Sequence, residues 1–239
     1  MPRFVLPRAA KRAVLATAGL ALAFTAVMGF AHTKPGRPLL VWMKIKGAAP
    51  GGCPLGYNVA QTPAQREAAR RRFASSHAGE FRALLRPALG FSLDETTRDD
   101  VQTWANEHGV SCKKPRSGPD LDCSDVPSRA LPEPYRGVPI GSLWMTFGDK
   151  GTLTSVIAVR RDASAEAISA TFVALTAEVD KEAGAKRSSE GNPSAAALSS
   201  APLKQASAEY RFRDYYALAR ATNMGQGFAL TEEYRSLPE

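Results

Sequence analysis

The sequence predicts an α+β fold, in which an antiparallel sheet of about five or six strands carries helices on one face and follows an N-terminal apolar helix. Two stretches, residues 142–160 and 208–235, alternate apolar and polar side chains, which is typical of strands with one buried face. Capping residues bracket other stretches that repeat apolar side chains at helical spacing. The N-terminal helix is predicted from an uninterrupted apolar run.

That run, residues 13–31, follows a basic flank, residues 1–12, which holds four Lys or Arg and no acidic residue. Nineteen helical residues would span roughly 28 Å, near the thickness of a bilayer's hydrocarbon core. The sequence therefore predicts a single-pass membrane anchor with the body on the extracytoplasmic, periplasmic side. The alternative is a signal peptide cleaved before His32, with Gly29 and Ala31 at the −3 and −1 positions, which would leave a periplasmic or secreted protein.

Charge and composition separate this N-terminal part from the body. Residues 32–62 are rich in proline and glycine and are predicted to connect the anchor to a single α+β domain, residues 63–239. The first 46 residues hold eight Lys or Arg and no Asp or Glu, whereas the remainder holds 23 of each sign. Because a body without a basic excess lacks the electrostatic footprint of a nucleic-acid-binding protein, we expect no nucleic-acid partner.

The first helix of the body is predicted to begin at Thr62 and Pro63, an N-cap residue and a first helical residue of the preferred types, and to end before Pro87. Its later apolar positions are Phe73, Phe81, Leu84 and Leu85. Its early turns carry a cluster of arginines, namely Arg66, Arg70, Arg71 and Arg72. Such a cluster usually forms a solvated helix face, and a contact with acidic lipid is the alternative interpretation.

Two further helices are predicted from caps and apolar stripes. Thr96 or Thr97 caps the second, which ends at His108 before Gly109. Its apolar face consists of Val101, Trp104, Ala105 and His108. The third, residues 164–183, presents one stripe made of Ile168, Phe172, Leu175 and Val179. A stripe of this kind is expected to cover a sheet.

A β-hairpin is predicted where residues 142–147 and 153–159 alternate around the turn 149–151. Trp144 lies on the face opposite the apolar one, which indicates a partly covered surface aromatic or, alternatively, a second layer or a binding face. Residues 185–205 are predicted to form a loop, because they are rich in Ser, Ala, Gly and Pro. The chain then returns in three strand-like runs, residues 208–213, 215–222 and 228–234.

The three cysteines, Cys53, Cys112 and Cys123, are disulfide candidates in an exported chain. Three cysteines allow three pairings. The Pro- and Gly-containing segment between Cys112 and Cys123 favours a turn that brings its two arms together. We therefore predict an intramolecular Cys112–Cys123 bond and leave Cys53 as a loop cysteine whose thiol could bridge two copies of the chain.

No catalytic residue, cofactor-binding residue or metal ligand is predicted. Carboxylates cluster around Cys123 (Asp120, Asp122 and Asp125), but their spacing is not that of an EF-hand. The body holds only two histidines, His77 and His108, which excludes a histidine-rich metal site. There is no Gly-x-Ser-x-Gly elbow, and Gly225-x-Gly227 lacks the third glycine of a dinucleotide motif.

Residues 96–104 (TTRDDVQTW) followed by residues 143–156 (LWMTFGDKGTLTSV) resemble the bacterial envelope module of the BamE/SmpA/OmlA type. The resemblance covers residues 96–160. It implies two short helices, an antiparallel sheet, and a scaffold or protein-binding role without catalysis. This chain lacks the module's lipobox cysteine and continues with a third helix and more strands, so outer-membrane anchoring and barrel assembly are not carried over.

The sequence thus predicts a non-enzymatic scaffold or binding module of the bacterial envelope, which binds another protein or a small apolar ligand. The alternative is an extracytoplasmic hydrolase whose site cannot be recognised from sequence. Such a site needs titratable groups that converge in a pocket. Asp94, Glu95 and His108 are the polar residues whose positions would distinguish the two hypotheses.

Overall fold

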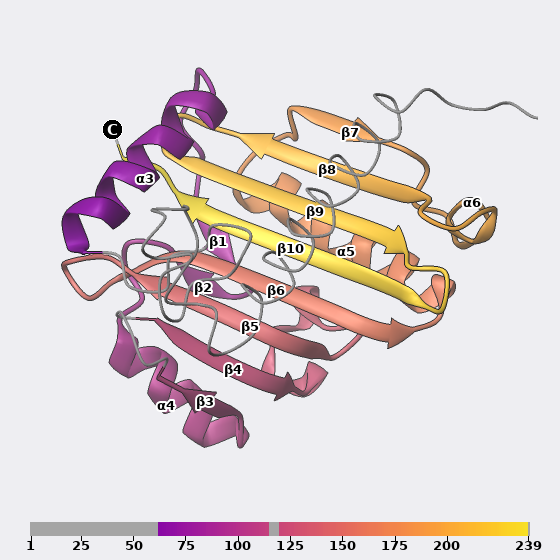
Figure 1. The fold of residues 1–239 in the computed structure, drawn as a ribbon, viewed down its shortest axis with the longest axis horizontal. Helices are drawn as coiled ribbons and strands as arrows, with labels where there is room; N and C mark the ends of the chain where they lie inside the picture. The colour runs from indigo at the N-terminus through magenta and orange to yellow at the C-terminus, as the bar shows by residue number, and fades with distance from the viewer. Residues whose placement is uncertain (1–61, 115–119, 239) are drawn as a thin grey trace, which may run out of the picture. The chain divides into compact units, whose positions relative to one another are not determined.

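Eight antiparallel strands form the sheet that organises the computed structural model, in which residues 62–114 and 120–238 are described (Figure 1). The order across the sheet is β3-β4-β5-β6-β10-β9-β8-β7. The strands are β3 (Ser111–Lys113), β4 (Leu121–Val126), β5 (Ile140–Phe147), β6 (Leu153–Ala163), β7 (Ser188–Glu190), β8 (Gln205–Arg211), β9 (Tyr215–Asn223) and β10 (Phe228–Ser236). The α+β class and the antiparallel sheet are confirmed.

The prediction of five or six strands is wrong, because the sheet has two further strands at its edges. β3 and β7 have three residues each, which is too short for a period of two to stand out. The predicted loop 185–205 contains β7 and also a short helix, α6 (Ala195–Ser199). A separate two-stranded ladder pairs β1 (Pro87–Ala88) with β2 (Phe91–Ser92).

The topology repeats a helix followed by a four-stranded meander. Helix α4 (Arg98–His108) precedes β3 to β6, and α5 (Ala165–Glu182) precedes β7 to β10. The two meanders join where the last strand of one, β6, pairs with the last strand of the other, β10. The long strands therefore lie in the centre of the sheet and the short ones at its margins.

Helices α4 and α5 cover one face of the sheet, called here the inner face. The apolar stripe predicted for α5 is buried, and the helix packs against β9 and β10, whose inward-facing residues such as Ala217, Leu230 and Tyr234 belong to the same core. Helix α4 is capped as the sequence predicts, by Thr97 at its start and by Gly109, with φ of 66°, at its end. Ser164, predicted as the first residue of its helix, is the N-cap of α5. At about 25 cal/mol per Å² of apolar area, this burial is the main stabilising contribution of the fold.

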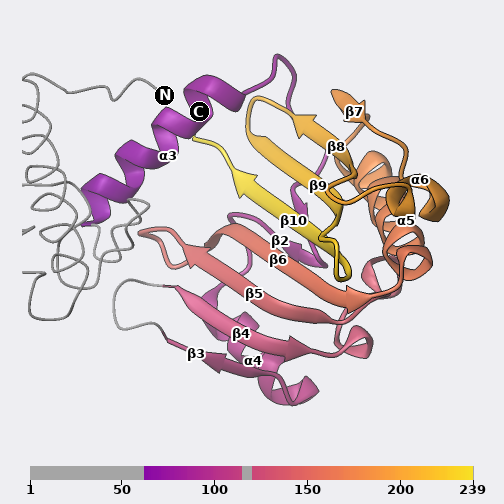
Figure 2. The ribbon, with the colours of Figure 1, turned by 45° about the vertical axis from the view of Figure 1, so that its right-hand side comes forward.

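Helix α3 (Pro63–His77) differs from its prediction in length and in position. It stops ten residues before Pro87, because the chain after Ala78 runs against β8: a Cβ on Gly79 would lie 2.0 Å from the carbonyl oxygen of Arg211. It also lies on the face opposite α5 (Figure 2). The prediction of helices on one face only is therefore wrong.

Helices in the described residues are all too short or too polar to cross a membrane. The predictions for the basic flank 1–12, the apolar run 13–31, the connector up to residue 61, and Cys53 fall outside the described residues.

A capping box at the start of α4 gives the fold a defined response to acid. The Thr97 hydroxyl and backbone N–H donate to Asp100 at 2.7 and 2.8 Å, and the Asp100 N–H donates to the Thr97 hydroxyl. The side-chain hydrogen bond, followed by the backbone one, lowers the pKa of Asp100 below its ordinary value. Asp100 therefore stabilises the fold above its unfolded-state pKa of about 3.9, and this contribution is lost as the pH falls through the lower folded-state pKa.

We expect Asp100→Asn to lower the free energy of unfolding near neutral pH, and we expect the difference from wild type to shrink as the pH falls below about 4. Urea unfolding at a series of pH values measures it. Asp99→Asn, which removes a charge from the same first turn, is the matched control. A difference that stays constant down to pH 2 would contradict the role of the Asp100 carboxylate.

Candidate functional site

The outer face of the sheet, opposite α4 and α5, is covered by α3 at one end. There the Phe73 and Tyr216 rings meet edge to face with centroids 5.1 Å apart, and the Arg235 guanidinium lies over the Phe73 ring. Arg70 donates through Nε to the Ser236 carbonyl oxygen at 3.1 Å and through Nη2 to its hydroxyl at 2.7 Å. These contacts hold α3 against β9 and the end of β10.

Trp144 lies on the outer face away from α3. Its strand neighbours Leu143 and Met145 are buried on the inner face, so the alternation of β5 turns Trp144 outward, where its side chain is 40 % exposed. Register places Trp144 between Asp122 of β4 and Ile157 of β6. The sequence predicted this orientation correctly.

Apolar and charged side chains divide the outer face between them. Ile157 is the cross-strand neighbour of Trp144, and Val159 points to the same side two residues further along β6. The same face carries an ion pair on β10, Glu233 with Arg235, and another on β8, Glu209 with Arg211. An amphipathic aromatic with aliphatic neighbours and a charged surround is the composition of a protein-binding patch.

The groups that a hydrolase hypothesis would need do not converge among the described residues. Asp94, which has φ of 64°, accepts from Arg86 Nη1 at 2.6 Å and also binds Ser236 and Arg70. His108 Nδ1 lies 2.8 Å from the Trp104 carbonyl oxygen in its own helix. In residues 62–114 and 120–238, no hydrogen bond or ion pair joins His108 to Asp94 or Glu95.

The three carboxylates near Cys123 are likewise separate. The described residues hold no group of three or more His, Cys, Asp or Glu side chains placed to bind a metal ion. Asp122 and Asp125 are exposed, whereas Asp120 is half-buried at the start of β4. Burial raises the pKa of Asp120, while a hydrogen bond with Thr146 and the charges of Arg66 and Arg98 act in the opposite direction.

Cys112 and Cys123 face each other directly across β3 and β4, with Sγ atoms 2.02 Å apart and Cα atoms 4.0 Å apart. The pair is therefore at disulfide distance. Cys112 lies in the edge strand β3, shortly after the end of α4, and Cys123 lies in β4, so the pair joins two neighbouring strands.

A buried ion pair between β6 and β10 was missed by the sequence analysis. Arg160 Nε donates to Glu232 Oε1 at 2.5 Å, and both side chains are fully buried. The other guanidinium nitrogens donate to the carbonyl oxygens of Val138 and Tyr135, and the Tyr234 hydroxyl donates to Glu232 Oε2 at 3.0 Å. Burial and the adjacent Glu232 charge raise the pKa of Tyr234 well above its ordinary value.

This network is a structural element of the core. Its polar atoms are used in contacts within the protein, which leaves none of them directed at a ligand. A signal for it exists in the sequence: Arg160 is in phase with the inward residues Val156 and Ala158, and Glu232 is in phase with Leu230. Two opposite charges on inward positions predict a buried pair once the strands are known to be neighbours.

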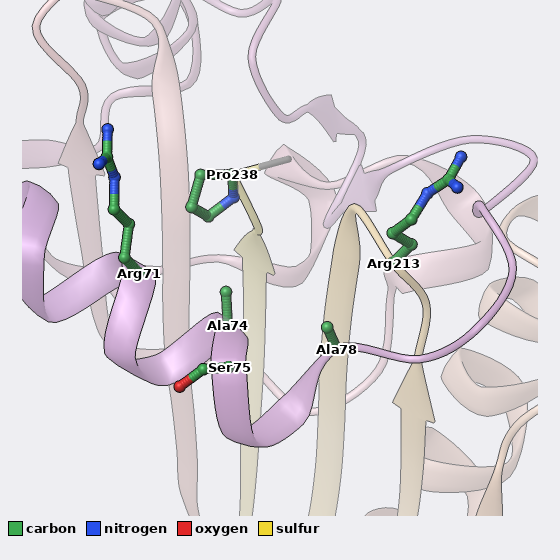
Figure 3. A pocket seen from close by; sticks show the side chains of 6 residues that line it. All are labelled: Arg71, Ala74, Ser75, Ala78, Arg213 and Pro238. Atoms are coloured by element: carbon green, nitrogen blue, oxygen red, sulfur yellow. The ribbon is translucent and has the colours of Figure 1, made fainter.

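An open cleft of about 720 Å³ lies between α3, the β8–β9 turn and the residues that follow β10. Its lining consists of Arg71, Ala74, Ser75, Ala78, Arg213 and Pro238 (Figure 3). The two arginines project on the same side of α3, at opposite ends of the cleft.

Comparison with family models, with curated proteins and with solved structures finds no significant match. The resemblance of residues 96–160 to the envelope module therefore stays a prediction.

Proposed function

We propose that the protein is a non-enzymatic binding module of the bacterial envelope and that it binds a protein partner through the outer face of its sheet around Trp144. The observation that carries this proposal is the exposure of Trp144 next to Ile157 and Val159. Tryptophan is among the residues that contribute most to protein interfaces, because one side chain supplies a large contact area.

The rigidity of the sheet also supports this proposal. Trp144 lies in β5, which is paired on both sides along most of its length, with β4 and with β6. A side chain held on such a scaffold loses little conformational freedom on binding, so more of the contact energy is retained as affinity. A scaffold role needs such a surface and does not need converging titratable groups.

The proposed location is the extracytoplasmic side of the cell membrane, with residues 13–31 as the anchor, or the periplasm if those residues are cleaved as a signal. Support comes from the apolar run in the sequence and from the cysteine pair at disulfide distance, because disulfides persist in oxidising compartments.

In-cell crosslinking tests the proposal directly. A photo-reactive residue at Asp122, opposite Trp144, is expected to give a discrete adduct in the native membrane. Because truncation of an interface tryptophan weakens binding by about 2 kcal/mol or more, Trp144→Ala is expected to reduce that adduct roughly thirtyfold. Mass spectrometry of the adduct identifies the partner.

The matched control places the same photo-reactive residue at Val173, which is 52 % exposed on α5, on the other side of the sheet. We expect no adduct of the same mass from this position. Equal adducts from both positions, or an adduct from position 122 that Trp144→Ala leaves unchanged, would refute the outer face as the binding surface.

A further inference from the structure

Three of the most exposed large apolar side chains lie in the segment that follows α3. Phe81, Leu84 and Leu85 are 73, 76 and 62 % exposed. The sequence predicted all three as apolar positions of a helix, but the helix ends before them. Three apolar side chains directed at solvent within five residues form a patch that needs a partner.

The backbone of this segment is fastened to the body, so its outward side chains are held in place. Two backbone hydrogen bonds join it to the β8–β9 turn: Gly79 N–H donates to the Phe212 carbonyl at 2.9 Å, and Arg213 N–H donates to the Phe81 carbonyl at 2.7 Å. Two more join it to the end of α5: Leu84 N–H donates to the Ala183 carbonyl at 3.1 Å, and Leu85 N–H donates to the Glu182 carbonyl at 3.0 Å. The Asp214 carboxylate also accepts from the Ala83 N–H at 3.0 Å.

Charge is segregated in the body, although its sum is zero. Residues 63–86 hold six arginines and two glutamates, a net charge of +4. Residues 87–239 hold seventeen Lys or Arg and twenty-one Asp or Glu, a net charge of −4. The body as a whole thus has no basic excess, as expected, whereas α3 and the segment after it carry a net positive charge.

The positive charge and the apolar patch lie at the same end of the sheet. Arg71 and Arg213 flank the cleft beside α3 (Figure 3), and the backbone N–H of Arg213 donates to the Phe81 carbonyl. Arg71 and Arg72 are exposed on α3. One end of the body therefore combines arginines with projecting Phe and Leu side chains.

We infer that residues 63–86 dock on the surface of an anionic lipid bilayer. Phe and Leu side chains enter the boundary between headgroups and acyl chains, and arginines pair with the lipid phosphates. Charge complementarity favours this occupant, because an anionic bilayer presents negative charge over its whole surface, whereas a symmetric contact with a second copy would bring the same +4 segment against itself, which like-charge repulsion disfavours. Helix α3 is also the first described element after the predicted membrane segment, separated from it by the predicted connector, residues 32–62.

This inference goes beyond the proposed function, because it concerns a different surface and a different partner. The outer face around Trp144 would remain available to a protein while residues 63–86 contact lipid. Each surface can be altered without changing the other, so the two proposals can fail separately.

Tryptophan fluorescence of the full-length chain in vesicles tests the contact. The vesicles contain phosphatidylcholine alone or with one third phosphatidylglycerol, and the acyl chains carry bromine as a quencher. For each variant, the emission of the added tryptophan is the difference between the variant and the wild-type protein. In anionic vesicles, the emission added by Leu84→Trp should be quenched at least about twofold more than the emission added by Leu203→Trp. Leu203 is the matched control, since it is 74 % exposed and lies between α6 and β8, at the end of the sheet away from α3 (Figure 1).

Two further measurements separate lipid docking from its alternatives. Arg71→Glu with Arg72→Glu in the Leu84→Trp background should abolish the extra quenching while the circular dichroism spectrum stays unchanged. The proposal is overturned if quenching at position 84 equals that at position 203, or if it is the same without phosphatidylglycerol. It is also overturned, in favour of contact between copies, if emission of the Leu84→Trp variant shifts to the blue with protein concentration in detergent alone.

Discussion

Arg160→Met should lower the free energy of unfolding by about 3–5 kcal/mol, the largest effect that we expect from a single substitution. The change leaves the Glu232 carboxylate fully buried without its counter-charge, with the Tyr234 hydroxyl as its remaining hydrogen-bond donor of those described. It also removes the donors to the carbonyl oxygens of Val138 and Tyr135. Because β6 and β10 join the two meanders, the loss acts on the centre of the sheet.

Urea unfolding followed by circular dichroism measures this effect. Arg161→Met is the control, because Arg161 is the next residue along β6 and its side chain is exposed, so a change within about 0.5 kcal/mol is expected. The double variant Arg160→Met with Glu232→Leu removes both charges. Its loss in free energy of unfolding should be markedly smaller than the sum of the losses of the two single variants. A small loss for Arg160→Met would mean that the pair is not buried in solution.

The sequence predicts elements well where the information is local. The bounds of α4 follow from its capping residues, Thr97 and Gly109. The alternation of apolar and polar residues in β5 places Trp144 on the outer face. The end of α3 could not be predicted in this way. It is set by the approach of Gly79 to the backbone of Arg211 in β8, a contact between segments far apart in the chain.

The candidate surfaces show the same division. The outward orientation of Trp144 was predicted correctly, because the turn and the alternation of apolar residues in one hairpin decide which way it points. The pairing of Arg160 with Glu232, 72 residues apart, depends on β6 lying beside β10, which no local pattern specifies. The exposure of Phe81, Leu84 and Leu85 was missed because these residues were interpreted as apolar positions of a helix that continues to Pro87.

Replacing Cys112 and Cys123 with serine should lower the free energy of unfolding by about 2–3 kcal/mol, because the bond would close a short loop and restrict the unfolded chain. The pair lies at the margin of the sheet, where β3 is three residues long and pairs with β4 alone. Without the bond, β3 is expected to separate first. Asp122, the neighbour of Trp144 in β4, pairs with Lys113 of β3, so the double variant should also weaken the crosslink from position 122.

Non-reducing peptide mapping of the full-length protein measures the pairing itself. A Cys112–Cys123 peptide is expected as the major species, and Cys53→Ser should leave its yield unchanged while it abolishes any disulfide-linked dimer. A major peptide that joins Cys53 to either of the other two cysteines would contradict the pairing. Cys112 and Cys123 are register partners in the adjacent strands β3 and β4, so forming the bond between them requires no rearrangement of the fold.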